Sequence, residues 1–97
     1  MGDYIKLTEE EIMETMPDFP VWDYKDNCMT KEFVNKNFAS AIGFVNSVAI
    51  IAEKLDHHPD ILIYGWNKIR IKIYTHVVNG LTKRDFELAG KIDELGF

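Results

Sequence analysis

Residues 68–76 read Lys68-Ile69-Arg70-Ile71-Lys72-Ile73-Tyr74-Thr75-His76, a run in which isoleucines alternate with charged or polar residues. Successive side chains on a β-strand point to opposite faces, so this pattern predicts a half-buried strand over residues 68–75. The isoleucine face must be the core face, because a shift of one residue would bury the charged side chains instead. His76 is therefore expected on the polar side at the end of this strand, or just past it.

Three other segments are expected to form strands. Residues 61–66 come directly before the alternating strand and are predicted to pair with it. Residues 21–25 and 28–34 form a second predicted pair around the turn Lys25-Asp26-Asn27. The sequence thus predicts two locally paired strands on each side of a central helix.

Two capping-box patterns mark helix starts. Thr8 is followed by Glu11, and Thr82 by Asp85, three residues later in each case. At this spacing the side chain of each residue can bond to the backbone N–H of the other. The first helix is expected to stop at Pro17, which cannot continue a helical hydrogen-bond ladder.

The order of these elements is αββαββα. Strands that pair locally, with helices between the pairs, predict an α+β fold. We expect a single domain over residues 1–97, in which a four-stranded antiparallel sheet carries the helices on one face.

The central helix is apolar over more than one face. Its expected core stripe recurs at spacings of three and four. This stripe consists of Phe38, Ala41, Ile42, Val45, Val48, Ala49, Ala52 and Leu55. Phe44, Ile50 and Ile51 lie off it, which suggests burial against another subunit or a wide contact with the core. The helix should end near residues 56–57, because Pro59 disfavours helical angles in the residue before it.

Composition excludes several kinds of partner and suggests a compartment. The 97 residues carry a formal charge of −5 and a pI of about 5.1, which argues against binding to nucleic acid or to an anionic membrane. The most apolar segment contains Asn46 and Ser47, so we interpret it as a core helix rather than a membrane span. Cys28 is the only cysteine, and a reducing, cytoplasmic location is expected.

The chain has three histidines, His57, His58 and His76, for which three interpretations stay open. They could be structural, since an imidazolium is favoured at a helix C-terminus. They could bind zinc, although adjacent histidines seldom reach the same ion. They could also act as a metal-free acid–base pair, because imidazole titrates near neutral pH. Glu53 and Asp56 are placed to orient an imidazole, or are simply solvated.

Two spaced blocks resemble the signature of the pterin-4a-carbinolamine dehydratases. The first is Glu53-Lys54-Leu55-Asp56-His57-His58-Pro59, and the second is Thr75-His76 followed by Gly80-Leu81-Thr82-Lys83-Arg84-Asp85. Trp66 lies between them, and the similarity covers about residues 8–95. The resemblance implies the same αββαββα fold and the removal of water from 4a-hydroxytetrahydropterin to give quinonoid dihydropterin, which recycles the pterin after aromatic amino acid hydroxylation.

The resemblance also implies roles for individual residues and no metal or cofactor. His57, His58 and His76 would be catalytic, with His57 and His76 as the acid–base pair and His58 chiefly contacting the pterin ring. The other positions implied to bind or border the substrate are Asp56, Pro59, Trp66 and Asp85. Asp85 would also cap the last helix.

Similarity to this family implies partners as well. Its members form homodimers or homotetramers, with the long helices packed together in the tetramer, and some act as a coactivator by binding the dimerisation segment of a transcription factor. A non-catalytic binding module is therefore the alternative interpretation. The chain departs from the family in four places: an extra residue between Pro59 and Asn67, Ile61 and Leu62 in place of an aromatic, Val77 in place of an acidic residue, and Asn35 in place of an aromatic.

Overall fold

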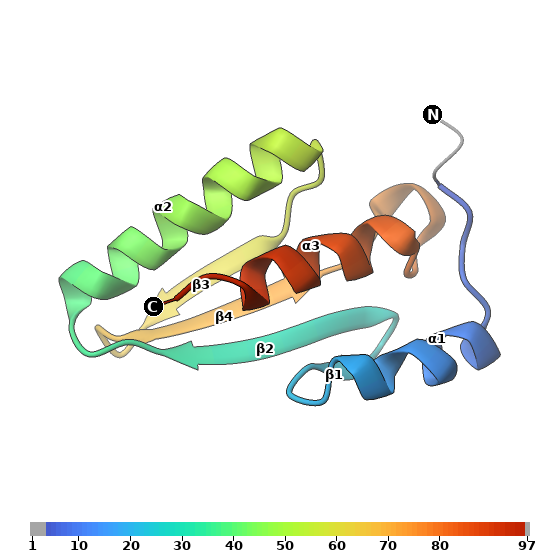
Figure 1. Ribbon diagram of the computed structural model, residues 1–97, viewed down its shortest axis with the longest axis horizontal. Coiled ribbons are helices and arrows are strands. Elements are labelled where there is room, and N and C mark those ends of the chain that lie inside the picture. Colours follow the sequence, from blue (N-terminus) through green and yellow to red (C-terminus); the bar gives the residue numbers. More distant parts are fainter. Residues whose placement is uncertain (1–3, 97) are drawn as a thin grey trace.

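The computed structural model describes residues 4–96 and contains three α-helices, two short 3-10 helices and one four-stranded antiparallel sheet (Figure 1). The predicted order αββαββα is confirmed. The elements are α1 (Glu9–Thr15), η1 (Met16–Asp18), β1 (Asp23–Lys25), β2 (Cys28–Val34), α2 (Phe38–Leu55), β3 (Asp60–Tyr64), β4 (Lys68–Ile73), η2 (His76–Val78) and α3 (Lys83–Asp93).

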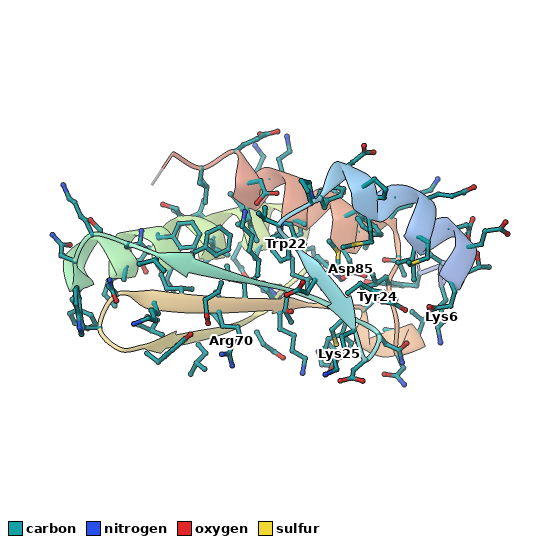
Figure 2. All side chains as sticks on the ribbon, turned by 90° about the horizontal axis from the view of Figure 1, so that it is seen from below. Lys6, Trp22, Tyr24, Lys25, Arg70 and Asp85 are labelled. Carbon is teal, nitrogen blue, oxygen red and sulfur yellow. The ribbon has the colours of Figure 1, made fainter. Side chains whose placement is uncertain are left out.

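The sheet has the strand order β1-β2-β4-β3, so the alternating strand β4 is central. Ile71 lies opposite Lys31 of β2 and Ile61 of β3. The three isoleucines of β4 have no exposed surface, and the alternation therefore selects the core face as predicted. Figure 2 shows the helices together on this face, with Arg70 on the opposite side.

Both predicted capping boxes are present. The Thr8 backbone N–H donates to the Glu11 carboxylate at 2.8 Å, and the Glu11 N–H donates to the Thr8 hydroxyl at 3.1 Å. Thr82 and Asp85 form the equivalent pair at the start of α3. α1 ends at Thr15, and the next turn, which contains Pro17, tightens into η1.

Two hairpin turns set the ends of the strands. Asp26 and Asn27 connect β1 to β2 with positive φ angles, and Gly65 and Trp66 do the same between β3 and β4. Two consecutive residues of positive φ form the turn that suits the twist of a hairpin. β3 therefore ends at Tyr64, two residues before the predicted end, because Gly65 and Trp66 form the turn.

The three other strand differences are small. β1 begins at Asp23 rather than Val21, and β3 begins at Asp60 rather than Ile61. β4 ends at Ile73, and Thr75 instead forms an isolated bridge with Gly80. His76 consequently lies just past the strand, which is one of the two predicted positions.

The predicted core stripe of α2 is partly wrong. Ala41, Phe44, Val48 and Ala52 are the buried residues of this helix, and Val45, Ile51 and Leu55 pack against the core. Phe44 was expected off this stripe but is only 2% exposed, in keeping with the wide contact with the core, whereas Phe38 and Ile42 are 55% and 38% exposed. The stripe is rotated because apolar residues cover so much of the helix that its periodicity does not select one face.

α2 is also long and apolar enough to cross a membrane by length and composition. In this domain it instead lies along the sheet beside α3, with its buried side against β4 (Figure 1). Its other side exposes Phe38, Ile42, Ala49 and Ile50 to solvent.

We predict that Ile71→Ala will lower the free energy of unfolding by about 2–5 kcal/mol, because it leaves a cavity at the centre of the sheet. Urea denaturation followed by circular dichroism measures this change. Lys68→Ala, on the exposed face of the same strand, is the control and should change stability by less than about 0.5 kcal/mol. Equal losses in the two variants would contradict the assignment of the core face.

Candidate functional site

The end of α2 fixes the first two histidines. Asp56 adopts a left-handed conformation with a φ of 53° and donates its N–H to the Glu53 carbonyl at 3.2 Å. The His57 N–H donates to the Ala52 carbonyl at 3.0 Å. This pair of bonds is the Schellman arrangement that closes many helices. With Pro59 two residues later, it turns the chain sharply out of the helix and holds the backbone of His57 in place.

The ring of His57 is bound to a buried carboxylate. Its Nε2 lies 2.6 Å from Oδ1 of Asp85, and the two side chains are 8% and 0% exposed. The other oxygen of Asp85 accepts the Thr82 N–H at 2.8 Å and the Thr75 hydroxyl at 2.7 Å. Asp85 therefore caps α3, as predicted, and also orients His57.

Asp85 is fully buried. Its side chain has no exposed surface, contacts the ring of His57 and lies on the helix side of the sheet (Figure 2). In this arrangement it reaches the solvent-facing groups of the site through the histidine that it holds.

His58 is much more open than its neighbour. Its side chain is 56% exposed, and its Nε2 lies 2.5 Å from a carboxylate oxygen of Glu53. Of the two acidic residues expected to orient an imidazole, Glu53 thus contacts His58. Asp56 contributes its carbonyl, which accepts a hydrogen bond from Arg84 Nη1 at 3.2 Å and ties the end of α2 to the start of α3.

His76 comes from the other segment. It opens η2 directly after Thr75, whose N–H donates to the Gly80 carbonyl at 2.9 Å. Its ring lies against Tyr74, with ring centroids 4.2 Å apart. The Thr75–Gly80 bridge therefore turns the chain at the end of the sheet and leaves the imidazole exposed there.

These two segments meet at one pocket of about 290 Å³. All three histidines line it. A pocket of this size suits part of a small flat ligand rather than a macromolecule. The described residues that line it are Tyr4, Asp56, His57, His58, Pro59, Asp60, Tyr74, Thr75, His76 and Val77.

Trp66 is not part of this pocket. It lies in the β3–β4 turn, whereas the pocket is formed beside Asp60, at the opposite end of the same hairpin. Its side chain is 62% exposed. The structure therefore does not bring Trp66 to the pocket that the histidines line, because the hairpin carries it to the far end of the sheet.

Five lining residues were not predicted to be site residues, namely Tyr4, Asp60, Tyr74, Thr75 and Val77. Tyr74 could have been found, since it shares the polar face of the strand with His76 and lies two residues before it. Tyr4 belongs to the segment before α1, and nothing in its local sequence indicates a site.

A second pocket, of about 650 Å³, is larger but chemically less specific. It lies between the N-terminal segment, the end of α2 and the start of α3, and it contains no histidine. Its lining is Ile5, Leu7, Glu11, Lys54, Leu55, Lys83, Arg84 and Glu87. We take the smaller pocket as the candidate site, because it holds the groups that can transfer protons at neutral pH.

No set of three histidine, cysteine or acidic side chains among residues 4–96 is arranged to hold a metal ion. Cys28 is buried, and this burial raises the pKa of its thiol. A raised pKa keeps the thiol protonated and unreactive. The described residues that line the pocket present imidazole, carboxyl and hydroxyl groups.

Comparison with known proteins matches the sequence of this chain to one family. The family model described as pterin 4 alpha carbinolamine dehydratase matches residues 5–95. Two relatives named "Putative pterin-4-alpha-carbinolamine dehydratase" come from Picosynechococcus sp. and Sulfurisphaera tokodaii. The Picosynechococcus protein is 46% identical to this chain and the Sulfurisphaera protein 44%, each over 90 residues. The match covers 93% of this chain in both cases, and 97% and 96% of the two relatives, respectively.

Two solved structures share the fold. A transcriptional coactivator/pterin dehydratase from Brucella melitensis has a TM-score of 0.85 and 35% identity over 92% of this chain and 96% of its own. A pterin dehydratase-like RuBisCO assembly factor of the alpha-carboxysome has a TM-score of 0.60 at 19% identity, covering 74% and 82% of the two chains, and shows the fold alone. From the full-length match and the identity to its relatives, the chain belongs to the pterin 4 alpha carbinolamine dehydratase family.

Proposed function

We propose that this protein removes water from a 4a-hydroxytetrahydropterin to give quinonoid dihydropterin, by metal-free acid–base catalysis with histidine. The observation that carries this proposal is the single pocket in which His57, His58 and His76 meet from two separate segments. Imidazoles are suited to the reaction, because each can accept or donate a proton at neutral pH.

The reaction needs one proton donated and one removed. A general acid protonates the hydroxyl on C4a, so that the C–O bond breaks and water leaves. A general base takes a proton from a neighbouring ring nitrogen, whose electrons form the new double bond. No oxidant or reductant is required, because the two protons and the electron pair balance within the substrate and the two side chains.

We assign His57 and His76 to this acid–base pair. His57 is buried and fixed by Asp85, which gives it a defined direction toward the pocket. His76 belongs to the other segment, and the Tyr74 ring packs beside it at an interplanar angle of 40°, which adds aromatic surface for a planar ligand. His58 is more exposed and is bound to Glu53, so we assign it to contact with the pterin ring.

The remaining lining residues border the ligand. Asp56 and Pro59 follow the end of α2, next to the histidines. The Asp56 carboxylate would accept hydrogen bonds from the nitrogens of the pterin ring. The substrate would arise where an aromatic amino acid hydroxylase oxidises tetrahydropterin, and dehydration would return it to the pterin pool. We propose a cytoplasmic location for this cycle, in keeping with the unpaired Cys28.

We predict that His57→Gln and His76→Gln will each lower kcat by about 10²–10⁴-fold, since each removes one proton-transfer group. The loss of chemically generated 4a-hydroxytetrahydropterin, followed by rapid-mixing absorbance, measures this rate. His58→Gln is the comparison, and it should act mainly on KM. A double His57→Gln, His76→Gln variant as fast as the wild type, after correction for the uncatalysed reaction, would overturn the catalytic assignment.

The alternative is a non-catalytic binding module that works as an oligomer. The Brucella protein is described as both coactivator and dehydratase, so the two activities are named together for a relative. The variants above separate the two possibilities. A binding module would keep its affinity for a partner when the histidines are replaced, and it would give no acceleration of the dehydration.

We also propose that the chain forms a homodimer or homotetramer through α2. Phe38, Ile42, Val45 and Ala49 follow one another at spacings of four, three and four, which places them along one line of the helix. Phe38 and Ile42 are exposed, and Val45 is only partly covered. An exposed apolar line of this kind is typical of helix pairing between subunits.

Ile42→Glu is predicted to reduce the oligomer to smaller species, because it introduces a charge into the apolar line. Light scattering coupled to size-exclusion chromatography measures the mass. Met13→Glu on α1 is the matched control, since Met13 is 63% exposed and lies on a different helix. An unchanged mass for Ile42→Glu, or an equal change for Met13→Glu, would contradict this interface.

A further inference from the structure

The carboxylate that holds His57 is itself held by two threonines. Thr75, Thr82 and Asp85 are 2%, 0% and 0% exposed. The hydroxyl oxygens of Thr75 and Thr82 lie 3.0 Å apart, and that of Thr75 lies 2.7 Å from Asp85 Oδ2. Buried polar groups must form hydrogen bonds with one another. The donor in each contact can therefore be deduced by counting the protons that each group has to donate and the hydrogen bonds that it accepts.

The count begins with Asp85. With the shared proton on His57, Asp85 accepts hydrogen bonds at both of its carboxylate oxygens. Its Oδ2 accepts from the Thr82 N–H and the Thr75 hydroxyl, and its Oδ1 accepts from His57 Nε2. A buried carboxylate is stable only with such a set of donors.

The direction of the hydroxyl chain then follows. Thr75 has one hydroxyl proton, which it gives to Asp85, so the contact between the two threonines is donated by Thr82. Thr82 Oγ1 accepts the Arg84 backbone N–H at 3.2 Å and is left with its own proton to donate. The order is therefore Thr82 to Thr75 to Asp85, with each hydroxyl donating once.

We propose that Thr75 is a positioning residue that fixes the tautomer of His57. Its hydroxyl keeps Asp85 as an acceptor, and Asp85 in turn keeps the proton of neutral His57 on Nε2. Nδ1 is then the nitrogen of His57 that exchanges a proton with the ligand. The assignment of Nδ1 as the nitrogen that exchanges the proton rests on the proposed function, whereas the tautomer of His57 does not.

Thr75 also links the two halves of the pocket. Its side chain points inward to Asp85, its backbone bridges to Gly80, and the next residue is His76. Replacing its hydroxyl therefore tests the hydrogen-bond chain without removing any imidazole from the site. Thr75→Val removes the hydroxyl at similar volume, and Thr75→Ser keeps it.

The test is ¹⁵N NMR of the ligand-free protein with labelled histidine, in which the Nδ1 and Nε2 shifts distinguish the tautomers. The wild type and Thr75→Ser should show neutral His57 protonated on Nε2, and Thr75→Val should show a mixture of tautomers. In the dehydration assay Thr75→Val should lose about 10–100-fold in kcat with little change in KM, whereas Thr75→Ser should stay within about threefold.

If neutral His57 in the wild-type protein carries its proton on Nδ1, the inference is overturned whatever the activity. This measurement does not depend on whether any variant folds. A folded Thr75→Val protein with the wild-type tautomer and rate would overturn it as well. A wild type with the expected tautomer but no dehydration activity would leave the hydrogen-bond chain in place and refute the proposed function instead.

Discussion

The contact between His57 and Asp85 connects the parts of the molecule that form the pocket. Asp85 is bound by His57 at the end of α2, by Thr75 after β4 and by the backbone of Thr82 at the start of α3. One buried carboxylate thus caps a helix, joins three chain segments and orients an imidazole. Since a buried charge is stable only with all of its donors, the geometry of the site and the stability of this corner of the fold depend on the same bonds.

The sheet explains why the two histidine segments meet. β3 and β4 form a hairpin, so the start of β3 and the end of β4 lie at the same edge of the molecule. His57 and His58 come just before β3, and His76 comes just after β4. The alternating isoleucines of β4 hold this hairpin against the helices, and the meeting of the three histidines is therefore a consequence of antiparallel pairing at one end of the core.

Much of this could be predicted from the sequence, for identifiable reasons. The isoleucine alternation and the two capping boxes are local signals, and they correctly give the central strand and the starts of α1 and α3. The site could not be predicted as fully, because it depends on distant residues. The turn at Gly65 and Trp66 carries the tryptophan away from the pocket, the burial of Phe44 depends on the sheet that α2 covers, and the function of the Thr75 hydroxyl is visible only beside Asp85.

The proposed binding of one pterin between the end of α2 and the residues after β4 is tested most directly by NMR mapping. The labelled protein is titrated with 7,8-dihydrobiopterin, a stable pterin that cannot be dehydrated. We expect the largest chemical-shift changes on residues 56–60 and 74–77, with the imidazoles of His57, His58 and His76 among them. Saturable changes that leave all three imidazoles unmoved and lie on the exposed sheet face or along α2 would contradict it.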